Sequence, residues 1–398
     1  MKKSIKTFLK HPTKDSSNRS ANPAVIRAST ILFDSMQELY QHEKKIKKHQ
    51  KVSHYSYGRY GSSTTIELEN ILKELEQAFH VFLTGTGFGG VALAIMSICR
   101  PGDEILVSDN VYGPTKEISE KLLKEFNVIA RFYDPDSFDD LKSKVSKKTK
   151  MILVENPGSN TFEFQDLSKI VNLAKRKKIF TFLDNTWGTP LYLKPLKLGF
   201  DMSFSSATKY FSGHSDAMGG SLAVNKKVFK QIMFFYKLSG YRMSADEAYL
   251  IIRGLRTLDT RLNQHYENTK QVINFLKKQR KVKEILYPHK PRSKNYKLWK
   301  KYYSGATGLL SIVIKSKKKS SVIKFVNSLE LFGIGYSWGG FESLAILQEL
   351  RSNKKDEYLQ GRKYFRFNKD EHIVRLHIGL EDPNDLINDL KNSLRHVR

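Results

Sequence analysis

Cysteine is almost absent from this sequence, since Cys99 is the single one among 398 residues. One thiol cannot form an intrachain disulfide or a cysteine-based metal site, and few cysteines are typical of a reducing compartment, so we expect a cytoplasmic protein with no metal ion. Long apolar runs are missing too: the longest, residues 88–98, is much shorter than the ~20 residues that cross a bilayer. Residues 1–20 are polar and Lys-rich and lack the apolar segment of a secretion signal. We therefore expect neither a membrane protein nor a secreted one.

Acidic residues are scarce relative to basic ones. The chain carries 40 Asp and Glu against 68 Lys and Arg, a formal net charge of +28. A nucleic-acid-binding protein would need its positive charges gathered on one face or in one tail. The basic clusters instead lie along the whole chain, at residues 44–48, 147–148, 175–178, 277–278 and 317–319. We interpret the charge as a solvated surface and expect no nucleic-acid partner.

The remaining composition is that of a globular protein, with 40% hydrophobic and 27% charged residues. A chain of this length is expected to form about two or three domains. Residues 1–62 have no long periodic element and are interpreted as an extended arm, with a β-like run at 24–33 and a basic helix at 36–50. Such an arm has too little apolar periodicity to form a core of its own.

A strand–helix alternation over residues 63–256 predicts an α/β domain with a mostly parallel seven-stranded sheet. A helix over 66–79, with Thr64 or Thr65 as its N-cap, opens this domain. Right-handed crossovers would place helices on both faces of the sheet. The expected strands are 81–83, 104–108, 128–133, 151–155, 179–184, 202–205 and 220–224, and the expected helices are 88–97, 113–125, 167–176 and 227–236.

Residues 257–398 are expected to form a smaller α+β domain. A long helical segment, 245–276, interrupted or kinked near Gly254, leads into it. Its expected strands are 308–314, 334–337 and 374–378, and its expected helices are 320–331 and 385–394.

The chemically most informative stretch surrounds Lys209, which closely follows the strand at 202–205. Open α/β sheets build their ligand sites at this end of the strands, and lysine forms Schiff bases with carbonyl compounds when it is partly desolvated and neutral. The hydroxyls of Ser206 and Thr208 flank it. Taken by itself among 68 basic residues, Lys209 would be interpreted as a surface lysine, so the assignment depends on its neighbours.

Three further features accompany this lysine. Asp184 places a carboxylate at the end of an apolar strand, and Gly85, Thr86 and Gly87 place backbone N–H groups at a helix N-terminus, where a phosphate can bind. Tyr112 can stack on a planar ring, although a lone tyrosine is more often structural. Together with a Schiff-base lysine, these are the parts of a pyridoxal phosphate (PLP) site, in which an acid keeps the pyridine nitrogen protonated.

The residues also resemble the PLP enzymes of cysteine and methionine metabolism, in the same order from about residue 55 to the C-terminus. The resemblance implies PLP as the cofactor and the PLP-dependent transferase-like fold (fold type I) for the large domain. The motifs that carry it are Asp184-Asn185-Thr186-Trp187, Thr208-Lys209 with Gly213-His214-Ser215-Asp216 and Gly219-Gly220, Arg253-Gly254-Leu255-Arg256-Thr257-Leu258, Ser337-Trp338-Gly339-Gly340-Phe341-Glu342-Ser343, and Arg375-Leu376-His377-Ile378-Gly379-Leu380-Glu381-Asp382.

Roles for individual residues follow from the resemblance. Lys209 and Tyr112 would be catalytic. The cofactor would be bound by Lys209, Asp184, Gly85, Thr86, Ser206, Thr208 and Tyr112, and by Tyr57 and Arg59 of a neighbouring subunit. The substrate would be bound by Arg375, Ser337, Trp338, Tyr57 and Glu117, with Arg375 taking its α-carboxylate. The resemblance thus implies a homo-oligomer, a dimer of dimers whose active site is shared across each dimer, and it leaves a role for Asn160 open.

The implied substrate is an amino acid, and the implied reaction is the α,β-elimination of L-cystathionine to homocysteine, pyruvate and ammonia. A tryptophan at the position of Trp338 resembles the β-lyase branch of the family; γ-lyases, γ-synthases and methionine γ-lyases are the alternative. Racemisation of alanine and desulfhydration of cysteine are expected side activities, because elimination and racemisation both begin with removal of the Cα proton. Either Tyr112 or Lys209 would protonate the leaving sulfur.

Overall fold

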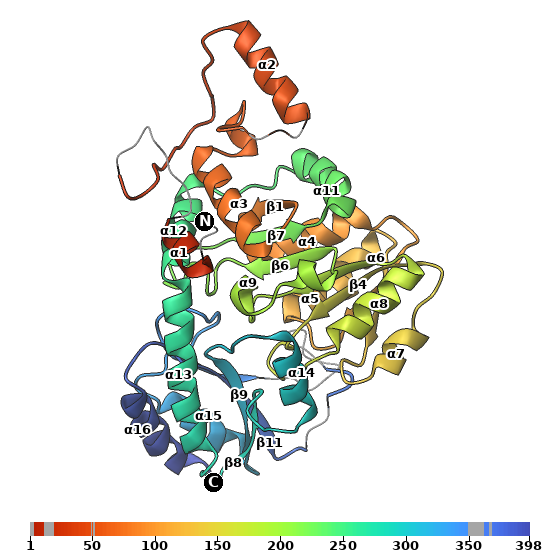
Figure 1. Cartoon of the computed structure of the whole chain (residues 1–398). Coiled ribbons are helices and arrows are strands. Elements are labelled where there is room, and N and C mark those ends of the chain that lie inside the picture. The colour runs from red at the N-terminus through yellow and green to blue at the C-terminus, as the bar shows by residue number, and fades with distance from the viewer. Residues whose placement is uncertain (1–3, 12–19, 49, 51, 349–361, 366–367) are drawn as a thin grey trace.

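The computed structural model describes residues 4–11, 20–48, 50, 52–348, 362–365 and 368–398. Figure 1 shows a large part built on a seven-stranded sheet, a smaller part built on a four-stranded sheet, and an N-terminal arm that extends away from the large part. Helix α13 (Leu258–Leu276) runs from the large part along the side of the smaller one. Within the described ranges, no helix has both the length and the apolar character that crossing a membrane requires.

The large sheet has the strand order β1-β7-β6-β5-β4-β2-β3. Strand β7 is antiparallel to β1 and β6, whereas the pairs from β6 to β3 are parallel, which confirms the mostly parallel seven-stranded sheet. Each strand lies within two residues of its predicted bounds. The strands are β1 (His80–Thr84), β2 (Glu104–Ser108), β3 (Ile129–Tyr133), β4 (Thr149–Glu155), β5 (Phe180–Asp184), β6 (Met202–Ser206) and β7 (Gly220–Val224).

Helices cover both faces of this sheet because the strand side chains alternate between two cores. In β5, Phe182 packs in the cluster that contains α4 and α11, and Leu183 packs in the cluster that contains α8. The arm and the large part contain α1 (Ile5–Lys10), α2 (Met36–Lys47), η1 (Gly58–Tyr60), α3 (Ser63–Glu76), α4 (Gly87–Ile98), α5 (Gly113–Glu117), η2 (Ile118–Leu122), α6 (Leu123–Glu125), α7 (Phe138–Ser143), α8 (Leu167–Lys177), α9 (Thr189–Tyr192), α10 (Pro195–Leu198), α11 (Lys226–Ser239) and α12 (Ala245–Arg256).

The smaller part is an antiparallel sheet of order β10-β11-β9-β8 with helices packed on it. Ile152 of the large sheet and Ile312 of the small sheet belong to one hydrophobic cluster, so the two parts share a core. The proposed division into 1–62, 63–256 and 257–398 stays a prediction. The elements here are β8 (Val282–Leu286), α14 (Lys294–Tyr302), β9 (Leu309–Lys315), α15 (Lys319–Asn327), β10 (Leu344–Gln348), β11 (Glu371–His377), α16 (Pro383–Ser393) and η3 (Leu394–His396).

The strand predicted at 334–337 is wrong. Ile334 and Tyr336 are exposed, and Ser337 has a φ of 79°, in the left-handed region that a strand does not contain. The edge strand of the small sheet is β10 instead, which pairs with β11. Strand β8 and helices α7 and α14 were not predicted; β8 buries one of its five residues, Ile285, so it shows little of the alternation that marks a strand.

Smaller corrections concern helix starts and the arm. Helix α3 begins after Ser62 rather than after Thr64 or Thr65, because the Thr65 hydroxyl accepts the Ser62 N–H at 2.9 Å. The β-like run at 24–33 forms no strand, and Thr30 makes an isolated bridge to Tyr57. The helix predicted at 113–125 is interrupted by the π-helical turn η2.

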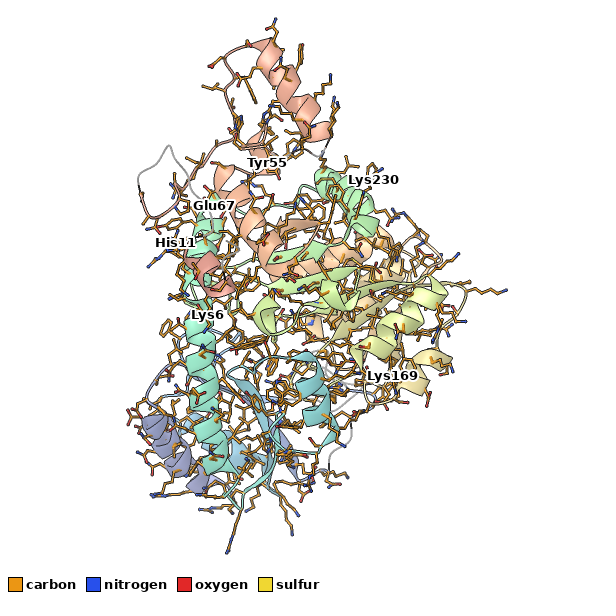
Figure 2. All side chains as sticks on the ribbon, viewed as in Figure 1. Lys6, His11, Tyr55, Glu67, Lys169 and Lys230 are labelled. Atoms are coloured by element: carbon orange, nitrogen blue, oxygen red, sulfur yellow. The ribbon has the colours of Figure 1, made fainter. Side chains whose placement is uncertain are left out.

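Basic side chains project outward from well-separated elements (Figure 2). Lys6 of α1, Lys169 of α8 and Lys230 of α11 are exposed and lie in different regions of the surface. These three lysines therefore form no common basic patch.

Candidate active site

The carboxyl ends of the parallel strands β4, β5 and β6 meet at one edge of the large sheet, and the predicted site lies there. The small sheet faces the same place through the loop after Gly335 and through strand β11. A pocket at this junction is lined by Asp184 of the large part and by Trp338 and Arg375 of the smaller part. The structure thus assembles the site from residues that are far apart in sequence.

Lys209 follows β6 in a tight turn. Its backbone N–H donates to the Ser206 carbonyl at 3.2 Å, and its ammonium donates to the Ser337 hydroxyl at 2.6 Å. The ammonium also lies 5.6 Å from the centre of the Trp338 ring. Burial lowers the pKa of Lys209 to about 8, with the positive charge of Arg375 acting in the same direction and Asp184 opposing it. A sizeable fraction of the amine is therefore neutral near physiological pH.

Asp184 ends β5 and is held in one orientation by the next turn. Its Oδ1 accepts hydrogen bonds from the Thr186 N–H at 2.9 Å and from the Thr186 hydroxyl at 2.5 Å. Burial raises the pKa of Asp184 to about 6, while the two Thr186 hydrogen bonds and the charge of Lys209 limit the rise. Asp184 is therefore ionised above that pH and places a negative charge at the floor of the pocket.

The Gly85–Gly87 turn and Ser206 approach each other at the N-terminus of α4. The Thr86 hydroxyl caps the helix by accepting the Gly89 N–H at 3.0 Å. A Cβ atom on Gly87 would lie 2.5 Å from the Ser206 hydroxyl oxygen, so only glycine permits this approach. The first N–H groups of a helix have no intrahelical partner and attract an anion.

Thr208 lies on the other side of the same turn. Its hydroxyl accepts the Gly219 N–H at 3.0 Å and also lies 3.4 Å from the Gly219 carbonyl. The hydroxyl that the sequence placed in the phosphate site is therefore engaged with the start of β7.

Arg375 lies in the middle of β11, paired with Ile346 on one side and Ser311 on the other. Its guanidinium donates to the Ser337 carbonyl at 3.1 Å, which places it in the pocket beside the residue that holds Lys209. Burial lowers the pKa of Arg375 to about 10, so the side chain stays positively charged at neutral pH.

A glycine brings the Trp338 loop against the lysine turn. Gly339 has a φ of 89°, and a Cβ atom there would lie only 3.0 Å from the Tyr210 nitrogen. The Gly339 N–H donates to His377 at 3.1 Å, and the Trp338 ring centre lies 5.4 Å from that of Tyr210. These contacts fix Ser337 and Trp338 relative to Lys209.

Tyr112 is 46% exposed and lies close enough to Glu155, Asp184 and Arg375 for their charges to act on its phenol. Its backbone N–H donates to the Glu155 carboxyl at 2.6 Å. Burial raises the pKa of the Tyr112 phenol, the charge of Glu155 adds to the rise and Arg375 opposes it. The Tyr112 hydroxyl therefore keeps its proton at neutral pH.

Three predicted residues lie apart from this group. Tyr57 is exposed, and the Arg59 guanidinium lies over the rings of Tyr57 and Tyr60, at 5.7 and 5.2 Å from their centres. Glu117 is exposed and pairs with Lys121 at 2.9 Å. Their predicted roles stay predictions.

Glu155 and Thr186 were not predicted as parts of the site, although both lie beside residues that were. A carboxylate at the end of a second parallel strand next to Asp184 was the available signal for Glu155. Asn160, left open by the sequence, lines the pocket, and its buried Oδ1 accepts no hydrogen bond from the described residues.

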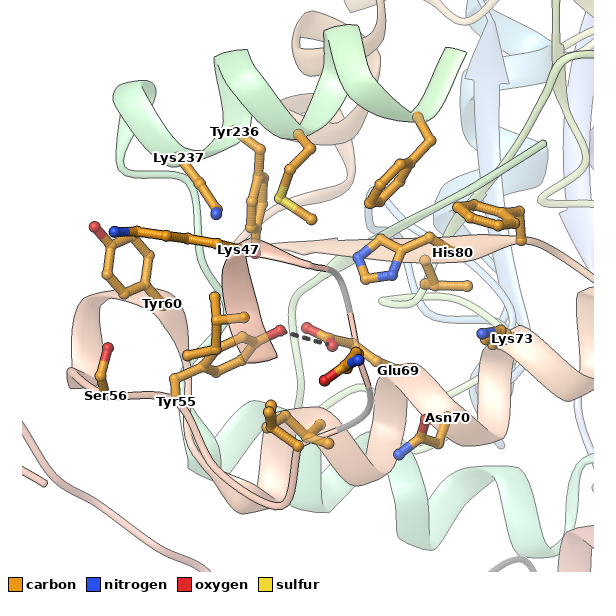
Figure 3. A pocket seen from close by; sticks show the side chains of 18 of the residues that line it. Lys47, Tyr55, Ser56, Tyr60, Glu69, Asn70, Lys73, His80, Tyr236 and Lys237 are labelled. Atoms are coloured by element: carbon orange, nitrogen blue, oxygen red, sulfur yellow. Dashed lines mark hydrogen bonds between the residues drawn. The ribbon is translucent and has the colours of Figure 1, made fainter. Parts of the chain in front are cut away.

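A roomier cavity, of about 710 Å³, lies away from Lys209, between the arm, α3 and α11. Figure 3 shows Tyr55 and Glu69 facing each other in it, with the Tyr55 hydroxyl donating to the Glu69 carboxyl at 3.0 Å. Burial raises the pKa of Glu69 to about 8, and the Tyr55 hydrogen bond partly offsets the rise. None of the predicted site residues lines this cavity.

Comparison with known proteins decides the family. Residues 6–395 match the family described as Cys/Met metabolism PLP-dependent enzyme. The chain belongs to this family. A cystathionine beta-lyase of Bordetella avium is 35% identical over 398 residues, 98% of each chain, and an L-alanine/L-glutamate racemase of Wolbachia pipientis wMel is 34% identical over 384 residues, 95% of this chain and 93% of that protein. The solved cystathionine gamma synthase of Xanthomonas oryzae pv. oryzae is 26% identical with a TM-score of 0.88, covering 100% and 99% of the two chains.

Membership makes this protein a PLP-dependent enzyme and confirms the expected fold type I architecture. Independently of these comparisons, the residues of the site have the chemistry that PLP requires. It offers a buried lysine with a lowered pKa, a carboxylate fixed by Thr186, and a glycine-lined helix N-terminus beside Ser206. Among the residues that the structure describes, none donates to the buried Oδ1 of Asn160 in the same pocket, so this oxygen can accept a hydrogen bond from a ligand.

The pKa of Lys209 predicts how fast the protein without cofactor captures PLP. Only the neutral amine attacks the aldehyde, so the capture rate should rise about eightfold between pH 6.5 and 7.5 and level off above about 8. Stopped-flow absorbance across this range measures it. A rate that keeps rising to pH 10 would mean that burial does not lower the pKa of this lysine.

Proposed function

We propose that this enzyme is a carbon–sulfur lyase that converts L-cystathionine and one water molecule to homocysteine, pyruvate and ammonia. The observation that carries the proposal is that Ser337 contacts both Lys209 and Arg375. Its hydroxyl accepts from the Lys209 ammonium at 2.6 Å, its carbonyl accepts from the Arg375 guanidinium at 3.1 Å, and the ammonium lies 5.6 Å from the centre of the Trp338 ring. The similarity to a protein named cystathionine beta-lyase over nearly the whole chain supports it.

The proposed cofactor residues are those named from the sequence. Lys209 holds PLP covalently, Asp184 pairs with its pyridine nitrogen, and Tyr112 stacks on the ring. The amides of Gly85 and Thr86 and the hydroxyls of Ser206 and Thr208 take the phosphate. When bound, PLP supplies an electron sink for the negative charge that develops at the substrate Cα.

The chain's own residues bind the substrate and move its protons. Arg375, with Ser337 and Trp338 beside it, binds the α-carboxylate through a two-pronged guanidinium contact and so fixes the orientation of the Cα–H bond. The Lys209 nitrogen accepts the Cα proton, and the Ser337 hydroxyl holds that nitrogen in place. Either the Tyr112 hydroxyl or the Lys209 ammonium donates a proton to the leaving sulfur. Glu117 is retained as a substrate-binding residue.

The decisive experiment is product analysis with L-cystathionine. Pyruvate coupled to lactate dehydrogenase, together with free homocysteine thiol, supports elimination at Cβ. Production of 2-oxobutyrate and cysteine instead would assign the γ-lyase alternative, which the similarity to a gamma synthase structure keeps in view.

Racemisation of alanine is the second candidate activity. It is favoured by the 34% identity to a protein named L-alanine/L-glutamate racemase and by the fact that Lys209 would remove the Cα proton in either reaction. Prolonged incubation with L-alanine should give D-alanine by chiral chromatography, and its absence after many enzyme equivalents would remove this activity. Cysteine desulfhydration is tested by sulfide release.

We further propose that the arm completes the site of a second copy of the chain. Helix α2 buries none of its residues, and Leu32, Met36 and Tyr40 are 87%, 54% and 65% exposed, so the arm carries apolar surface that a partner can cover. Tyr57 and Arg59 lie at its base, exposed and apart from Lys209. Sedimentation analysis of the chain with and without residues 1–50 tests the assembly as dimers or tetramers.

Replacing Arg375 with lysine should raise KM for L-cystathionine by about 10- to 100-fold with a smaller change in kcat, because lysine keeps the charge but loses the two-pronged contact. Steady-state kinetics measure the split. Arg131→Lys, at an exposed arginine of β3, is the matched control and should leave both constants unchanged. A loss confined to kcat would show that Arg375 does not bind the carboxylate in the ground state.

A further inference from the structure

Two carboxylates lie side by side at the floor of the site. Glu155 is the last residue of β4 and Asp184 the last of β5, and they are direct partners in the parallel ladder. Residues paired in this way project to the same face of a sheet. Both line the pocket that also contains Arg375.

The two carboxylates have different partners. Asp184 receives two hydrogen bonds from Thr186 and the attraction of the Lys209 charge. Glu155 receives one hydrogen bond, from the Tyr112 backbone N–H at 2.6 Å. A carboxylate accepts such a bond more strongly, but a neutral carboxylic acid still accepts it through its carbonyl oxygen.

Arg362, whose positive charge acts on Glu155, is engaged elsewhere. The buried Arg362 pairs with Asp109 at 3.2 Å and with Glu163 at 3.0 Å, and it also donates to the Thr161 hydroxyl. Among the described residues, the ion pairs of this region therefore neutralise Asp109 and Glu163 rather than Glu155.

Adjacent carboxylates with little solvent around them do not both ionise. Burial raises the pKa of Glu155 well above its usual range, and the negative charges of Asp184 and Glu163 add to the rise. The Tyr112 N–H and the charge of Arg362 oppose it. Asp184, with its two donors and the nearby ammonium, is the member of the pair that keeps the charge.

We propose that Glu155 is a positioning residue that stays uncharged in the working enzyme. Its carbonyl oxygen anchors the backbone of Tyr112, and its missing charge leaves Asp184 as the negative group that faces the cofactor. The part that concerns Asp184 rests on the proposed function, whereas the protonation state and the Tyr112 anchor can be tested without any substrate.

Infrared difference spectroscopy of the holoenzyme reads the protonation state directly. The spectrum of wild type minus Glu155→Gln at pH 7.5 should contain the C=O stretch of a protonated carboxylic acid. The matched control is Glu284→Gln, at an exposed glutamate of β8, which should remove only carboxylate bands. Carboxylate bands in the Glu155→Gln difference spectrum would overturn the proposal, whatever reaction the enzyme catalyses.

Two substitutions separate the anchor from general packing. Glu155→Gln keeps an oxygen acceptor without a charge, so it should retain most of kcat/KM and leave the pH profile in place. Glu155→Leu removes the acceptor and should lower kcat/KM about tenfold, with circular dichroism unchanged. A Glu155→Gln enzyme whose pH profile shifts by a full unit, or which loses as much activity as Glu155→Leu, contradicts the proposal. If Glu155→Leu fails to fold, the glutamine variant and the infrared spectrum decide it.

Discussion

Lys209→Ala should abolish turnover and remove the visible absorbance of the bound cofactor. We assign two roles to the Lys209 side chain, the covalent bond to PLP and the transfer of the Cα proton. An alanine side chain can fill neither role. Loss of a positioned general base costs about 10²- to 10⁴-fold in rate, and loss of the covalent link adds to this. The measurements are the pyruvate assay with L-cystathionine and the absorbance spectrum of the purified protein.

The controls for Lys209→Ala separate chemistry from folding. Lys230→Ala, at an exposed lysine of α11, should behave as wild type in both assays (Figure 2). The Lys209 variant should unfold at a temperature close to that of the cofactor-free wild type, because a partly desolvated amine contributes little to stability. A variant that retains both turnover and the visible band would refute the assignment of this lysine.

The large sheet was predictable because its strands carry their own signal. Runs such as 104–108 and 220–224 are mostly apolar, bounded by turns and buried on both faces, which is the pattern of a sheet covered by helices on each side. The β8 and β10 strands of the smaller sheet are only partly buried, and neither has a clear alternation of buried and exposed residues. Their strand character comes from pairing with β9 and β11, a long-range property that local sequence does not contain.

The candidate site also combines residues that local sequence predicts with contacts that depend on distant parts of the chain. Lys209 and Asp184 could be predicted from residues within their own strands and turns. The contact between Lys209 and Ser337 joins residues that are 128 positions apart, and the resemblance to a family was the sole guide to it. Glu155 was missed because a glutamate at a strand end is commonplace. Its place beside Asp184 and its hydrogen bond with the Tyr112 N–H become evident only once β4 and β5 are known to be neighbouring strands.

Asp184→Asn should lower turnover by about 10³-fold and weaken cofactor binding, with the fold preserved. Asparagine keeps the size of the side chain and its Oδ1 can still accept both Thr186 hydrogen bonds, so the change removes the charge and little else. Without that charge the pyridine nitrogen loses its proton and the ring becomes a poor electron sink. Kinetics and the dissociation constant for PLP measure the effect. Asp139→Asn, at an exposed residue of α7, is the control.

The neighbouring glutamate makes this prediction sharper. Removing the charge of Asp184 removes one cause of the raised pKa of Glu155, so Glu155 becomes easier to ionise in the Asp184→Asn enzyme and can replace part of the missing charge. Adding Glu155→Gln to the Asp184→Asn enzyme should therefore lower kcat/KM by a clearly larger factor than the same substitution does in wild type. Independent residues would instead give additive effects on the activation free energy. Additivity within experimental error would mean that the two carboxylates do not share a charge. A deeper loss in the double variant would show that the charge belongs to the pair, and that Asp184 carries it because Thr186 and Lys209 stabilise that position.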